Sequence, residues 1–241
     1  MTTPIFIALD FPTADEMWDF LSAFPTDNRP AVKVGMELFY AEGPNLVKDL
    51  KAAGFTVFLD LKLYDIPNTV GQAVKNLAKL DVDYLTVHAA GGKRMMEAAV
   101  AGANEGARTL GVTPPKLLAI TQLTSFSEAE MQETQMVTAS LNDSVVHLAK
   151  LAKSAGIDGT ISSAFESQMI HDAVGDDFLS ITPGIRLAGD SQGDQSRVMT
   201  PERAAEKTAD GLVVGRSITQ ASQPVNAYQL VVKGFEGVKH G

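Results

Sequence analysis

The sequence predicts an α/β protein of the (β/α)₈ class, a TIM barrel, folded as a single domain over residues 1–241. Short runs of apolar, often β-branched residues alternate eight times with longer segments of helical periodicity. Such runs are typical of parallel strands that are buried on both faces. No linker, low-complexity tract or change of composition interrupts the array. Because α/β barrels reach this length as one domain, one closed barrel accounts for the whole chain.

The expected strands follow in the order 5–9, 31–34, 55–61, 84–87, 117–121, 159–162, 178–182 and 212–214. The helices expected between and after them are 13–24, 43–53, 67–80, 93–108, 141–155, 166–173, 201–209 and 223–238. Thr13 stands three residues before Glu16, which is the spacing of a capping box. Proline suits the first turn of a helix and occurs there at Pro44, Pro67, Pro201 and Pro224.

Two connections, 122–140 and 183–200, are longer than usual for a compact domain. The second is rich in glycine and polar residues. Long loops in such domains commonly serve an active site. The segment 183–200 is therefore predicted to be functional, with a floppy surface loop as the alternative.

The composition of the chain limits the classes of partner that it can bind. The formal net charge is −9 and the chain contains no cysteine. A negative field opposes nucleic acid, so no such partner is expected. No apolar stretch approaches the roughly 18 residues of a membrane helix, and the first residues lack the basic part of a secretion signal. We expect a cytoplasmic protein without a membrane partner, in which any anionic ligand meets a local cluster of cations.

Polar residues mark the ends of the expected strands, where a barrel builds its active site. They are Asp10, Lys33, Asp60, Lys62, His88, Thr121, Thr124, Arg186, Gly215 and Arg216. The first and last of these meet only if the sheet closes into a ring, so their convergence depends on the barrel.

Four charges of alternating sign dominate one sector of this rim. Asp60 and Lys62 are two apart and face the same side of a strand, while Lys33 lies on the neighbouring strand and Asp65 follows shortly after. Carboxylates nearby keep a lysine charged, which suits a proton donor rather than a Schiff-base nucleophile. A structural salt bridge is the alternative for the first pair, and capping of the helix at Pro67 is the alternative for Asp65.

The last strand–helix unit predicts a phosphate site. Gly215 and Arg216 follow the strand at 212–214, where backbone N–H groups at a helix start attract phosphate. Arg186 on the preceding loop adds a second cation, and loops after strands seven and eight often form such a site. The four histidines lack the spacing of metal ligands, and no nucleotide-cofactor motif is present. We therefore expect neither a metal nor a cofactor.

The segment 60–69, DLKLYDIPNT, resembles the signature of the orotidine 5'-phosphate decarboxylase family. The resemblance extends in order along nearly the whole chain, through the segments 7–10, 32–35, 123–125, 182–186 and 213–218. It implies a barrel that works as a homodimer and converts orotidine 5'-monophosphate to uridine 5'-monophosphate (UMP) and carbon dioxide, the last step of de novo UMP synthesis. No metal or organic cofactor is implied.

The resemblance also implies roles for individual residues. Lys62 would deliver the proton, within a charge array completed by Lys33, Asp60 and Asp65. Residues donated across the dimer interface would be Asp65, Ile66 and Thr69. Asp10 and Lys33 would bind the ribose, and Thr124 would contact the pyrimidine. The phosphate would be held by Arg186, Gln195, Gly215 and Arg216, and Pro183 would also contact the substrate. Because Gln195 lies in the segment 183–200, the resemblance implies that this segment is a closing lid.

The expected chemistry is electrostatic. Loss of carbon dioxide from orotate leaves a carbanion in the ring plane, which the ring cannot delocalise, and a fixed ammonium can stabilise and then protonate it. The nearest alternative is a Mg²⁺-dependent sugar-phosphate decarboxylase or aldolase with the same D-x-K-x-x-D pattern. A phosphosugar isomerase or epimerase on this fold, and a nucleotide-binding protein without activity, are further alternatives.

Overall fold

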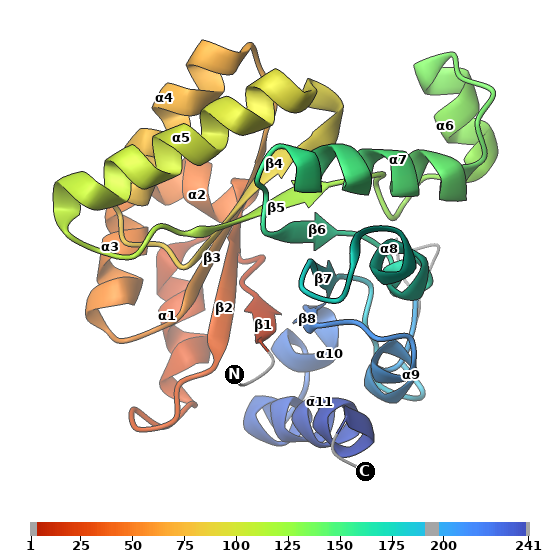
Figure 1. Ribbon diagram of the computed structural model, residues 1–241. Coiled ribbons are helices and arrows are strands. Elements are labelled where there is room, and N and C mark those ends of the chain that lie inside the picture. Colours follow the sequence, from red (N-terminus) through yellow and green to blue (C-terminus); the bar gives the residue numbers. More distant parts are fainter. Residues whose placement is uncertain (1–3, 191–197, 240–241) are drawn as a thin grey trace.

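The computed structural model describes residues 4–190 and 198–239 and confirms the predicted barrel (Figure 1). All strands pair in parallel and in chain order, and β1 closes the ring by pairing with β8. The strands are β1 (Ile5–Ala8), β2 (Ala31–Gly35), β3 (Val57–Leu63), β4 (Tyr84–His88), β5 (Lys116–Ile120), β6 (Gly159–Ile161), β7 (Leu179–Thr182) and β8 (Gly211–Val214).

Helices surround the ring (Figure 1). They are α1 (Ala14–Ser22), α2 (Met36–Glu42), α3 (Pro44–Ala52), α4 (Pro67–Ala78), α5 (Lys93–Leu110), α6 (Glu128–Gln135), α7 (Leu141–Ser154), α8 (Ser167–Val174), α9 (Pro201–Glu206), α10 (Arg216–Thr219) and α11 (Pro224–Lys239), with a 3₁₀ turn, η1 (Ala89–Gly91). Every predicted helix is present among them. In the part of the chain that the structure describes, α2 and α6 are additions to the prediction, and α10 begins at the helix start expected at Gly215 and Arg216.

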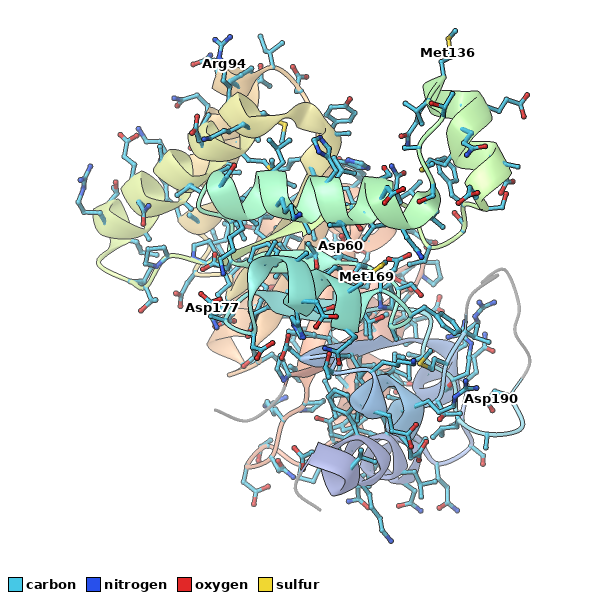
Figure 2. All side chains as sticks on the ribbon, turned by 45° about the vertical axis from the view of Figure 1, so that its right-hand side comes forward. Asp60, Arg94, Met136, Met169, Asp177 and Asp190 are labelled. Atoms are coloured by element: carbon cyan, nitrogen blue, oxygen red, sulfur yellow. The ribbon has the colours of Figure 1, made fainter. Side chains whose placement is uncertain are left out.

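The added helix α6 was not predicted from the sequence. It lies inside the long connection 122–140 and buries only Met131, so no apolar periodicity marks it. Its start is a capping box, in which Ser127 and Glu130 each accept a backbone N–H of the other. Figure 1 shows α6 extending away from the barrel, and Met136 lies at the outer end of this arm in Figure 2.

The inside of the barrel is apolar at its amino-terminal end and polar above it. Phe6, Phe58 and Tyr84 interlock edge to face, with the ring centroids of Phe6 at 5.1 Å from Phe58 and 5.0 Å from Tyr84. Alternate residues of a strand face the same side, so the next inward residue of β3 after Phe58 is Asp60. The aromatic layer therefore lies directly below the charged residues inside the barrel.

Small residues allow α4 and α5 to lie in close contact (Figure 1). A Cβ added at Gly102 would collide with the carbonyl oxygen of Gly71, and one at Gly106 with the carbonyl oxygen of Lys75. The colliding atoms are backbone, so relief requires the helices to separate. This packing sets the position of α4, whose first turn carries Thr69.

We expect Gly102→Ala to lower the free energy of unfolding by about 1–3 kcal/mol, because overpacking outweighs the better helix propensity of alanine. Urea denaturation measures the effect. Gly237→Ala is the matched control, since this helical glycine of α11 has no atom within 4 Å of an added Cβ. Equal urea midpoints for the two variants would show that the α4–α5 contact tolerates a methyl group.

Candidate functional site

A cavity of about 480 Å³ opens at the carboxyl ends of the strands. Its floor includes the inward side chains Phe58, Ile120 and Val213. Of the residues predicted for the site, those lining the cavity are Asp10, Lys33, Asp60, Lys62, Thr124, Pro183, Arg186, Gly215 and Arg216. Side chains from β1, β2, β3, β7 and β8 thus converge, as closure of the sheet requires.

Asp60 is the centre of the charge array and lies near the middle of the molecule in Figure 2. Its Oδ2 is 2.8 Å from Lys62 Nζ and 3.9 Å from Lys33 Nζ. Lys33 Nζ is also 3.3 Å from Asp10 Oδ1. The Lys33 and Asp60 side chains are only 10% and 11% exposed, whereas that of Lys62 is 32% exposed. The Lys62 ammonium is therefore held by a buried carboxylate and reaches the open space.

The backbone at Lys62 is irregular. The pairing of β3 with β4 shifts between Leu59 and Leu63, and Lys62 has a φ of +50°. A residue other than glycine seldom adopts this left-handed conformation, and such strain is common at functional sites. The Lys62 N–H donates to Thr86 Oγ1 at 2.8 Å, and the Thr86 hydroxyl donates to Asp60 Oδ1 at 2.9 Å. Sequence analysis missed Thr86, because a threonine in a buried strand carries no local signal.

Asp65, Ile66 and Thr69 are exposed, and the cavity lining within the described residues does not include them. Asp65 Oδ1 accepts the N–H of Ile66 at 2.6 Å. The helix α4 has Ile66 as its N-cap and no capping side chain, so the alternative that Asp65 caps this helix is wrong. Within one chain Asp65 does not line the cavity beside Lys33, Asp60 and Lys62, and its place in the charge array across a dimer interface stays a prediction.

The cations predicted for phosphate follow β7 and β8, which β1 separates from β2 and β3 in the closed ring. Arg186 is 8% exposed, and its Nη1 donates to the Ile185 carbonyl at 2.9 Å. Gly215 follows β8 and is the N-cap of α10, and Arg216 is the first residue of that helix. The cavity lining thus includes the cations Arg186 and Arg216 in addition to the two lysines.

The ends of the predicted lid 183–200 are joined. The Arg186 N–H donates to the Met199 carbonyl at 3.0 Å, and the Met199 N–H donates to the Gly184 carbonyl at 3.1 Å. Gly184 and Arg186 line the cavity, so both ends of the loop lie at its edge. The predicted phosphate ligand Gln195 lies outside the described residues.

Thr124 is joined at the cavity wall by Gln122, which sequence analysis also missed. Gln122 is 3% exposed and exchanges hydrogen bonds with the Gln135 side chain at 2.8 and 3.1 Å. It also donates to Ser144 Oγ at 2.9 Å. The cavity wall is thereby tied to the end of α6 and the first turn of α7.

His88 serves local structure. Its Nδ1 accepts the Ala90 N–H at 3.2 Å, and its ring stacks on Tyr64 with centroids 5.3 Å apart. Burial, and then the nearby Lys62 ammonium, lower the pKa of His88 below its usual value. Among residues 4–190 and 198–239, no group of three or more His, Cys, Asp or Glu side chains is placed to hold a metal ion. No helix in the same ranges is long and apolar enough to span a membrane.

Comparison with known proteins identifies the family. The model of the Orotidine 5'-phosphate decarboxylase / HUMPS family matches residues 3–231. The chain belongs to this family. The orotidine 5'-phosphate decarboxylase of Oenococcus oeni is 56% identical over 98% of this chain and 100% of that protein. The one from Lactiplantibacillus plantarum is 56% identical over 95% of this chain and 97% of that protein.

A solved structure of the orotidine 5'-phosphate decarboxylase family has a fold similar to that of this chain. The crystal structure of orotidine 5'-phosphate decarboxylase from Lactobacillus acidophilus is 42% identical, with a TM-score of 0.87, and covers 97% of this chain and 99% of that one. The resemblance drawn from residues 60–69 is confirmed.

Proposed function

We propose that this protein is an orotidine 5'-phosphate decarboxylase, a cofactor-independent carboxy-lyase that forms UMP and carbon dioxide in the last step of de novo UMP synthesis. The observation that carries this function is the Lys62 ammonium, held 2.8 Å from Asp60 in a cavity whose lining also includes Arg186 and Arg216. The names of the full-length relatives agree with it.

The reaction breaks the bond between the pyrimidine C6 and the carboxylate carbon. Carbon dioxide leaves, and the electron pair stays on C6 as a vinyl carbanion. Lys62 stabilises this charge and transfers an ammonium proton to C6, after which its neutral amine recovers a proton from water. Asp60 lies beside the reacting carboxylate and disfavours the bound reactant more than the transition state, in which that charge moves away.

The other lining residues bind the nucleotide. Asp10 and Lys33, already paired with each other, hold the ribose, and Thr124 and Pro183 contact the base. The phosphate is held by Arg186, Gln195, Gly215 and Arg216. Closure of the segment 183–200 over the phosphate excludes water, and binding energy remote from the base drives that closure.

The enzyme works as a homodimer in which Asp65, Ile66 and Thr69 enter the partner's site. Two features support this arrangement. Asp65 is exposed and does not line the cavity of its own chain. Large exposed side chains flank it in sequence, with Tyr64 and Ile66 at 62% and 66% exposure, and Tyr40 of α2, the helix that follows the neighbouring strand β2, is 70% exposed. The charged substrate and product do not cross membranes unaided, and we place the reaction in the cytoplasm.

A spectrophotometric assay tests the function. We expect purified protein to convert orotidine 5'-monophosphate to UMP at the same rate with and without a chelator of divalent cations. No absorbance change at saturating substrate would contradict the function. Loss of activity with the chelator, restored by Mg²⁺, would contradict cofactor independence and favour the sugar-phosphate alternative.

A further inference from the structure

Thr86 lies beneath the cavity at the centre of β4 and is completely buried. The reaction described above uses no group from this strand. Yet its single hydroxyl contacts two residues of the charge array, accepting the Lys62 N–H at 2.8 Å and donating to Asp60 Oδ1 at 2.9 Å. A hydroxyl can do both because it carries one proton and two lone pairs.

The first contact compensates for a break in the sheet. Leu59 pairs with Leu85 and Leu63 pairs with Val87, so Thr86 alone stands opposite three residues of β3. The N–H of Lys62 there donates to the threonine side chain, in place of a backbone carbonyl of β4. This bond holds Lys62 at its φ of +50°, a conformation that persists only where its surroundings enforce it.

The second contact orients the carboxylate. The Thr86 hydroxyl donates a hydrogen bond to Asp60 Oδ1. The other carboxylate oxygen, Oδ2, is then directed at Lys62 Nζ and Lys33 Nζ. Without that bond the carboxylate could rotate about its terminal torsion, which is broad for aspartate. The Thr86 hydroxyl thus fixes the backbone conformation of Lys62. It also fixes the direction of the Asp60 carboxylate, which positions the Lys62 ammonium.

We propose that Thr86 is a positioning residue for decarboxylation, holding the Asp60 carboxylate and the Lys62 backbone in the geometry that aims the ammonium at C6. The proposal rests on the proposed function. It predicts a defect in the chemical step with little effect on nucleotide binding, because Thr86 is completely buried and lies outside the cavity lining.

The test compares Thr86→Val, which keeps the shape and removes the hydroxyl, with Thr86→Ser, which keeps the hydroxyl. In single-turnover experiments with enzyme in excess, we expect valine to slow decarboxylation about 10- to 100-fold, since misplacement of a reacting group costs rates of this size. Serine should remain within about threefold of wild type, and UMP should bind each variant within about threefold of its wild-type affinity. Thr160→Val is the control, a completely buried threonine of β6 outside the cavity lining, and should react at the wild-type rate.

Three results would overturn the proposal: a valine variant with more than half of the wild-type rate, a serine variant as slow as valine, or a rate defect matched by an equal loss of UMP affinity. If the valine variant does not fold, Thr86→Cys replaces it, because a thiol is a weaker donor and acceptor. A cysteine rate equal to that of serine would then reject the hydroxyl's role. Inactive wild-type protein would instead contradict the proposed function itself.

Discussion

Replacing Lys62 by alanine is expected to abolish decarboxylation while the barrel remains folded. The substitution removes both the ammonium that stabilises the carbanion and the proton that ends the reaction, so we expect kcat/KM to fall by at least about 10⁴-fold. The fold should persist because Asp60 keeps its bonds to Lys33 and Thr86. Steady-state kinetics and thermal unfolding measure the two effects separately.

Lys75→Ala is the control for the loss of a lysine. Lys75 is also ion-paired, with Glu105 at 2.5 Å, but it lies on α4 outside the cavity. Its removal should leave kcat/KM within about twofold of wild type, because this partly exposed pair lies away from the site. A Lys62→Ala variant with more than a tenth of the wild-type activity would contradict the role of Lys62 as proton donor.

Mixing two inactive variants is expected to restore activity if Asp65 acts in the partner's site. Asp65→Ala and Lys62→Ala each impair both sites of their own homodimer. In a mixed dimer, one site combines the intact Lys62 of one chain with the intact Asp65 of the other. Equal amounts with free exchange should recover about a quarter of the wild-type activity, because half of the dimers are mixed and each has one whole site.

The unmixed variants and a mixture kept from exchanging subunits provide the baseline. Differently tagged chains, recovered together, demonstrate exchange. If exchange is proven and activity stays at the baseline, Asp65 serves its own chain. The arrangement in trans, and with it the proposed homodimeric site, would then be wrong.

Local sequence was sufficient for the repeating units of the barrel. The eight strands and the helices that follow them could be predicted because each buries an apolar face with its own period. The helix α6 could not, since its residues are mostly polar and it buries only Met131. Its capping box at Ser127 and Glu130 was the available signal.

Some features of the candidate site could likewise be predicted from the sequence, and others could not. Spacing along β3 placed Asp60 and Lys62 on one side, and their pairing at 2.8 Å agrees with it. The bulge opposite Thr86 has no such signature, because a register shift depends on how two strands meet. Spacing likewise gave no sign that Asp65, three residues after Lys62, would lie outside the cavity lining of its own chain.

From the order of its residues alone, this chain specifies an eight-fold β/α array, the charged strand ends and the motif shared with its family, because these follow from short-range periodicity and residue type. Folding in three dimensions adds the meeting of Asp10, Lys33 and Asp60 from separate strands and the hydroxyl of Thr86 beneath them. Those contacts depend on ring closure and strand register, which join residues far apart in the chain, and no local pattern encodes such distances.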